Sequence, residues 1–359
     1  MAKLTYHEQK DLDNTKKLRA LIKELPPFCS DFFRGIEPRT STRTRIAYAY
    51  DLRIFFDFLR ENNPQFSKLA PRDITLSMLE QLGSMDIEEY MDFLHAYSRE
   101  NRGELVNTER GLTRKLASLK SFYNYFFRME RISTNPAALV QLPKIHEKEI
   151  IRLEEEEVSR LIDIAESESG LSRHASGYHE KTRVRDTAIL TLFLGTGIRI
   201  SELVGLDNDS FDFSNNSFIV TRKGGNNAIL YFSDEVKYAL EEYIAEKSHD
   251  EKVPSQENAF FLSMQYKRIN VRSVEILVKK YSSIVTPLKK ITPHKLRSTY
   301  GTRLYNETGD IYIVAVLGHK DVNTTKKHYA AISEDNRKKV ADAVKLRQEP
   351  DDTPPGDKN

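Results

Sequence analysis

Cysteine is almost absent from this 359-residue sequence, because Cys29 is the only one. A single thiol excludes an intramolecular disulfide and a zinc site built from cysteines, so a reducing, intracellular compartment fits best. Long apolar runs are missing too. No segment approaches the roughly 20 apolar residues of a membrane helix, and the charged N-terminus has no apolar signal core. We therefore expect a soluble, cytoplasmic protein.

Net charge is also small. Lys and Arg total 55 against 53 Asp and Glu, a net charge of +2. The net charge therefore gives no indication of nucleic-acid binding, and such an indication has to come from local clusters of basic residues. The length exceeds that of a usual single domain and 39% of the residues are hydrophobic, which predicts two domains with separate cores.

Amphipathic helices dominate the first 135 residues or so, and no strand pattern competes with them. One helix begins after Ser41 or Thr42 as N-cap and another after Thr108, and shorter patterns lie around 14–24 and 86–98. We predict an all-helical domain with a basic exterior. Its two clearest buried stripes are Tyr48, Leu52, Phe55 and Leu59, and Leu112, Leu116, Leu119, Tyr123 and Phe126.

A domain boundary is predicted at Asn135–Lys148, which contains two prolines and little periodicity. Acidic residues soon after it mark a fresh helix start. The predicted parts are a helical domain at 1–148, a second domain at 149–346 and a disordered, acidic, proline-rich tail at 347–359.

The second domain combines helices with one hairpin. Ser217–Arg222 and Ala228–Phe232 are β-rich runs on either side of a Lys-Gly-Gly-Asn-Asn turn. The fold class is therefore mainly α with a small β-sheet (α+β). Helices are predicted at 154–166, 184–194, 234–247, 270–282, 294–306, 310–317 and 323–346.

Several polar residues lie at element boundaries, where a side chain can point into a cleft. A glycine-bracketed turn places Arg199 at the start of a helix, with Glu202 three residues later on the same face. The pair could equally be a surface ion pair. Lys223 lies in the hairpin turn, where most lysines are simply solvated.

A second group lies nearer the C-terminus. Thr292 and Pro293 begin a helix whose first turns carry His294 and Arg297 on one face. A helix N-terminus with an imidazole and a guanidinium suits a phosphate, although a structural His–Arg pair is the alternative.

Two more candidates follow. His319 comes after a helix that ends at glycine, and Tyr329 lies one helical stretch further on, in NTTKKHYAAI. A tyrosine considered alone is usually a packing residue, so Tyr329 is a candidate only together with the arginines, histidines and lysine described above. Two arginines, two histidines, a lysine and a late tyrosine suit metal-free transesterification at a phosphodiester, in which arginines neutralise the non-bridging oxygens. The tyrosine attacks and the lysine protonates the leaving 5′-oxygen.

In this order the set resembles the catalytic domain of the tyrosine recombinase (phage integrase) family, over roughly residues 150–345. The resemblance implies that the chemistry depends on Arg199, Lys223, His294, Arg297, His319 and the nucleophile Tyr329. It also implies that the helical N-terminal half is a core-binding domain, and that the two domains clamp duplex DNA.

Within the family the chain looks most like the single-component Xer recombinases. That likeness implies a 3′-phosphotyrosyl intermediate, no cofactor and no metal. It implies resolution of chromosome dimers at a dif-like DNA site during cell division, by a homotetramer on two DNA sites with a cell-division DNA translocase as partner. Three alternatives stay open: a mobile-element integrase, a type IB topoisomerase that relaxes DNA as a monomer, and a DNA-binding module without chemistry.

Overall fold

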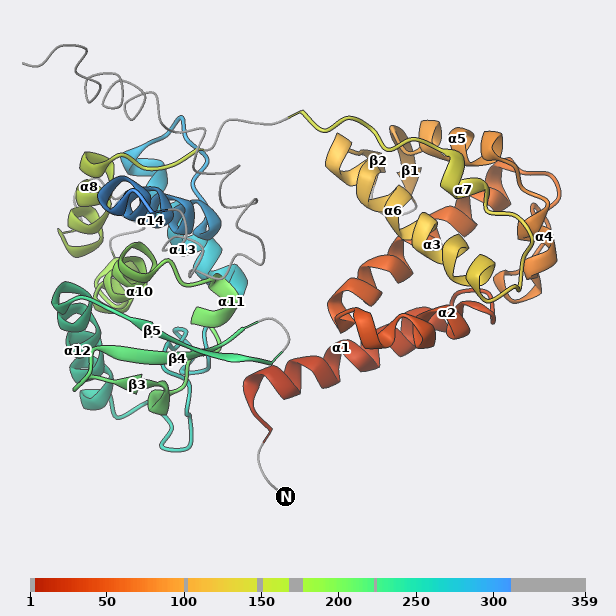
Figure 1. Cartoon of the computed structure of the whole chain (residues 1–359). Helices are drawn as coiled ribbons and strands as arrows, with labels where there is room; N and C mark the ends of the chain where they lie inside the picture. Colours follow the sequence, from red (N-terminus) through yellow and green to blue (C-terminus); the bar gives the residue numbers. More distant parts are fainter. Residues whose placement is uncertain (1–3, 100–102, 147–150, 168–176, 223–224, 311–359) are drawn as a thin grey trace, which may run out of the picture. The chain divides into compact units, whose positions relative to one another are not determined.

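The computed structural model (Figure 1) describes residues 4–99, 103–146, 151–167, 177–222 and 225–310. The chain divides into two compact units, an N-terminal unit (Met1–Lys148) and a C-terminal unit (Glu149–Asn359). None of the helices in the described ranges is both long and apolar enough to cross a bilayer.

Helices make up most of the N-terminal unit, with a 3₁₀ turn after α2 and another before α4. The α-helices are α1 (Tyr6–Ile22), α2 (Cys29–Gly35), α3 (Thr42–Asn62), α4 (Leu76–Glu80), α5 (Ser84–Phe93), α6 (Glu109–Arg128) and α7 (Pro136–Leu139).

The core of this unit forms around α3 and α6, which begin where the sequence predicts. The hydroxyls of Ser41 and Thr108 each accept a hydrogen bond from the N–H three residues later, at 3.2 and 3.3 Å. Every residue of the two predicted stripes is buried except Tyr48, which is half-buried. Between the helices Phe122 lies 5.1–6.3 Å, between ring centroids, from four other phenylalanines. Aromatic packing therefore holds the unit together.

The prediction that this unit is all-helical is wrong at one place. Strands β1 (Ala96–Arg99) and β2 (Gly103–Val106) pair antiparallel, where the sequence predicts a helix over 86–98. Tyr97 is buried, and its ring centroid lies 5.1 Å from that of Phe93. The Tyr97 ring is buried in the fold while its backbone is extended, and the local sequence does not indicate this.

The C-terminal unit places a small sheet beside a helical cluster (Figure 1). Its helices are α8 (Glu155–Ser167), α10 (Arg183–Thr196), α11 (Ile200–Leu203), α12 (Asp234–His249), α13 (Val271–Val285) and α14 (Pro293–Thr308). Its strands are β3 (Phe211–Asp212), β4 (Ser217–Thr221) and β5 (Asn227–Tyr231), joined antiparallel in the order β3-β4-β5.

Helix α10 is the centre of this unit, because α8, α12 and α14 all pack against it. Ten of its fourteen residues are buried, so the helix is enclosed around most of its circumference, as expected of a core helix. The predicted hairpin is confirmed, with Thr221 opposite Asn227. The short strand β3 was not predicted. The helices predicted at 310–317 and 323–346 and the tail at 347–359 lie outside the described residues.

Candidate active site

The turn that leads to Arg199 depends on Gly197. This glycine ends α10 in the left-handed conformation, with φ at +60°, and its N–H donates to the Phe193 carbonyl at 3.0 Å. A Cβ atom at this position would lie 2.5 Å from Cδ1 of Tyr300. Glycine is therefore needed twice, for the backbone conformation and for the close approach of the ring.

Arg199 itself is the N-cap residue of α11. Its Nη1 donates to Oε1 of Glu202 at 2.8 Å, and its main-chain N–H donates to Oε2 at 3.0 Å. The Glu202 side chain is 3% exposed and that of Arg199 33%. The two oxygens of the Glu202 carboxylate thus fix both the side chain and the main chain of Arg199, and a third of the Arg199 side chain stays exposed.

Helix α14 starts as predicted, with Thr292 at its N-cap position and Pro293 in its first turn. The Thr292 side chain makes no capping hydrogen bond. The N–H of Lys295, which such a cap would engage, instead donates to the Thr292 main-chain carbonyl at 2.7 Å. A 3₁₀-type bond therefore replaces the side-chain cap.

The structure brings the two predicted arginine segments together. Arg297 is buried, and its Nη1 donates to the carbonyl of Gly197, two residues before Arg199. His294, one turn earlier on α14, is exposed. The Arg297 hydrogen bond therefore joins the first turns of α14 to the turn that follows α10.

The hairpin adjoins this site, since β4 packs against α11. At its tip the Arg222 N–H donates to the Asn226 carbonyl at 2.8 Å. The other members of the predicted set, Lys223, His319 and Tyr329, lie outside the described residues. In the part of the chain that is described, no three His, Cys, Asp or Glu side chains cluster so as to hold a metal ion.

Two residues that contact the segments next to Arg199 were not predicted from the sequence. Tyr300 packs on Gly197, and Arg268 donates to the carbonyls of Val204 and Leu206 just beyond α11. A glycine at position 197 indicates that another group approaches the main chain closely, but no sequence pattern identifies that group as Tyr300. Arg268 lies more than sixty positions from the carbonyls it binds, so no local signal exists.

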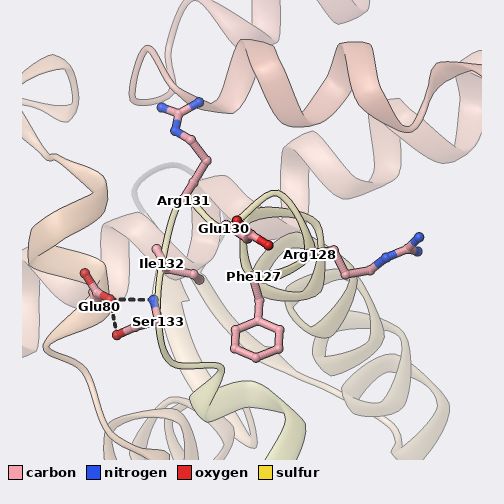
Figure 2. Close-up of a pocket in the computed structure, with 7 residues that line it drawn as sticks. All are labelled: Glu80, Phe127, Arg128, Glu130, Arg131, Ile132 and Ser133. Carbon is pink, nitrogen blue, oxygen red and sulfur yellow. Dashed lines mark hydrogen bonds between the residues drawn. The ribbon is translucent and has the colours of Figure 1, made fainter.

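A cavity of about 670 Å³ lies elsewhere, in the N-terminal unit (Figure 2). It is lined by Glu80, the end of α6 and residues 130–133, and Ser133 donates to Glu80 through both its N–H and its hydroxyl. None of the predicted catalytic residues in the described ranges lines this pocket.

Sequence comparison extends the likeness over most of the chain. Residues 151–336 match the model of the phage integrase family. Tyrosine recombinase XerC of Caldanaerobacter subterraneus subsp. tengcongensis is 31% identical over 90% of this chain and 88% of that protein. Tyrosine recombinase XerS of Lactococcus lactis subsp. cremoris is 28% identical over 91% of this chain and 97% of that protein.

Solved structures share the fold. The post-cleavage complex of the XerH site-specific recombinase with a palindromic difH substrate covers 84% of this chain and 78% of its own, with TM-score 0.60 and 15% identity. The Tn1549 transposon integrase in complex with circular intermediate DNA covers 87% and 98%, with TM-score 0.60 and 20% identity. This chain therefore belongs to the phage integrase family and is a tyrosine recombinase.

Proposed function

We propose that this recombinase cuts and rejoins duplex DNA at a dif-like site and so resolves chromosome dimers during cell division. The observation that carries the proposal is the hydrogen bond from Arg297 to the Gly197 carbonyl. This bond brings the segment of Arg297 next to the segment of Arg199, which supports a single site for a phosphodiester. The names of the relatives, XerC and XerS, support the chromosomal role over that of a mobile-element integrase.

In the proposed reaction the Tyr329 hydroxyl attacks the scissile phosphorus. A bond from the tyrosine oxygen to phosphorus forms, the bond to the 5′-oxygen breaks, and a 3′-phosphotyrosyl link remains. His294 takes part in transfer of the tyrosine proton, and Lys223 gives a proton to the leaving 5′-oxygen. Arg199 and Arg297 neutralise the non-bridging oxygens, and His319 donates to one of them.

Rejoining is the reverse reaction with a partner strand's hydroxyl. The protein link keeps the energy of the phosphodiester, so the reaction requires neither ATP nor a metal ion.

We assign DNA binding to the N-terminal unit, as a core-binding domain. Helix α6 exposes Arg110, Arg114 and Arg128 on its surface, an arrangement that suits phosphate contacts, which set register and salt dependence rather than sequence choice. Strand exchange would involve a homotetramer on two DNA sites, with a cell-division DNA translocase as regulator.

The helix that the sequence predicts at 323–346 carries Ile332, Val340, Ala341 and Val344, and we propose that it docks on a neighbouring protomer. The alternative is that it folds back on its own core. Removal of residues beyond about 335 should impair synapsis of two sites more than binding to one site. Equal loss of both would count against docking on a neighbour.

The test of the proposed chemistry is a nicked suicide DNA substrate with a dif-like site, followed by denaturing electrophoresis. Wild type should form a covalent protein–DNA band, and Tyr329→Phe should bind the DNA without forming one. Binding with no band from either protein would favour a non-catalytic DNA-binding module. Relaxation of supercoiled DNA by the monomer, without recombination, would favour a type IB-like topoisomerase.

A further inference from the structure

Helix α11, which carries Glu202 and is capped by Arg199, is only one turn long. Its four residues, Ile200–Leu203, cannot hold a helix by their own hydrogen bonds, because short helices are unstable without outside contacts. The position of Arg199 therefore depends on what holds the two ends of this turn. At the start, Arg297 donates to the Gly197 carbonyl.

At the far end the contact is made by Arg268. Its Nη1 donates to the carbonyls of Val204, the C-cap residue, at 3.0 Å and of Leu206 at 2.8 Å. Its Nη2 donates to the carboxylate of Asp207. The side chain of Arg268 is 19% exposed, so these bonds are largely shielded from competing water.

Arg268 is itself fixed by a different segment of the chain. It forms a β-bridge with Leu262, and two positions earlier Phe260 donates its N–H to the Leu206 carbonyl at 3.0 Å. The segment that follows α11 is thus tied to residues 260–268, which no motif of the sequence connects with the site.

We propose that Arg268 is a positioning residue, which holds the end of α11 so that Glu202 presents Arg199 to the scissile phosphate. The inference rests on the proposed function. The planar guanidinium places Nη1 on the two carbonyls and Nη2 on the carboxylate, and lysine, whose donors all lie on one nitrogen at the end of a flexible stem, cannot reproduce this fixed fork. A small displacement of the end of a one-turn helix passes to its first residue because no second turn absorbs it.

The test compares Arg268→Lys with Arg185→Lys in the full chain. Arg185 is a matched control: its side chain is 14% exposed, it pairs with the Asp186 carboxylate, and it donates to the Leu262 carbonyl at 2.9 Å. It makes none of these bonds to the segment after α11. Both variants are measured for thermal unfolding, for binding to the DNA site and for single-turnover cleavage of the suicide substrate.

We expect Arg268→Lys to bind DNA normally but to cleave at least about tenfold more slowly, since misplacement by about 1 Å can cost a hundredfold. In an Arg199→Ala background the same change should cause no further loss, because Arg268 acts through Arg199. Arg185→Lys should have equal, small effects in both backgrounds.

Unchanged cleavage by Arg268→Lys, or an equal loss with and without Arg199, would overturn the proposal and make Arg268 a general structural residue. If Arg268→Lys does not fold, Asp207→Asn replaces it, because this change removes the carboxylate that orients Arg268. Its effect on cleavage is then compared in the presence of Arg199 and in the Arg199→Ala background. No adduct even from wild type would refute the proposed function instead, so the two failures are distinguishable.

Discussion

Each unit of the molecule holds a partly exposed arginine on a deeply buried carboxylate. In the N-terminal unit Arg114, whose side chain is 47% exposed, pairs with Asp51, which is 1% exposed. In the C-terminal unit Arg199, at 33%, pairs with Glu202, at 3%. Both arrangements present a guanidinium on a fixed anionic base, which suits contact with phosphate.

The two pairs differ in how far the carboxylate is satisfied. Glu202 lies three positions from Arg199 and accepts from both its side chain and its main chain. Asp51 lies on α3 and Arg114 on α6, and Oδ1 of Asp51 accepts no hydrogen bond of ordinary geometry, although Ser118 lies beside it. The local pair fixes the side chain that we propose contacts the scissile phosphate, whereas the long-range pair ties two helices together.

Arg199→Ala should show the largest effect and separate the roles of the two pairs. Loss of a group that stabilises transition-state charge costs about 3 kcal/mol, so cleavage should slow about 100-fold or more while DNA binding persists. Single-turnover cleavage of the suicide substrate measures this. Arg272→Ala, at an exposed arginine that also pairs with a glutamate three residues on, should cleave normally. Unchanged cleavage by Arg199→Ala would rule out its assignment.

Gly197→Ala should come next, because it disturbs the backbone that carries the local pair. Alanine in the left-handed region costs about 1–3 kcal/mol, and its Cβ would displace Tyr300. Gly309→Ala is the control, since Gly309 has φ of +65° with nothing within 4 Å of an added Cβ. Both variants should unfold at lower temperature, but only Gly197→Ala should also lose cleavage. Equal cleavage would mean that the turn does not position Arg199.

Glu202→Gln tests the contribution of the carboxylate in the Arg199–Glu202 pair. Glutamine keeps an oxygen for the main-chain N–H but removes the charge beneath the guanidinium. A hydrogen bond to a charged group is worth about 1.5–3 kcal/mol, so cleavage should fall about tenfold or more. Single-turnover rates and DNA affinity, measured together, test this prediction. A loss confined to affinity would show that Glu202 supports binding rather than chemistry.

Contacts between residues close in the sequence could be predicted from the sequence, and contacts between distant segments could not. The spacing of Arg199 and Glu202 already predicts their pair, and helical periodicity predicts the stripes of α3 and α6. Nothing local links Arg268 to Val204, because their contact exists only once distant segments pack. The ribbon β1–β2 escapes prediction for the same reason, since the burial of Tyr97 depends on tertiary neighbours.

Asp51→Asn should have the smallest effect, visible as a pH dependence. Burial raises the pKa of the Asp51 carboxyl above its usual 3.8, against the opposing charges of Arg114 and Lys115. The folded state then holds this proton more tightly than the unfolded chain does. Wild-type stability therefore contains a contribution that is present below about pH 3.8 and is lost as pH rises through the folded pKa.

An asparagine side chain cannot ionise, so the Asp51→Asn protein lacks this decline. Urea unfolding of the whole chain, followed by circular dichroism from about pH 4 to pH 8, should show the stability advantage of wild type over Asp51→Asn shrinking with pH. If the wild-type advantage grows with pH instead, attraction to Arg114 outweighs burial at the Asp51 carboxylate.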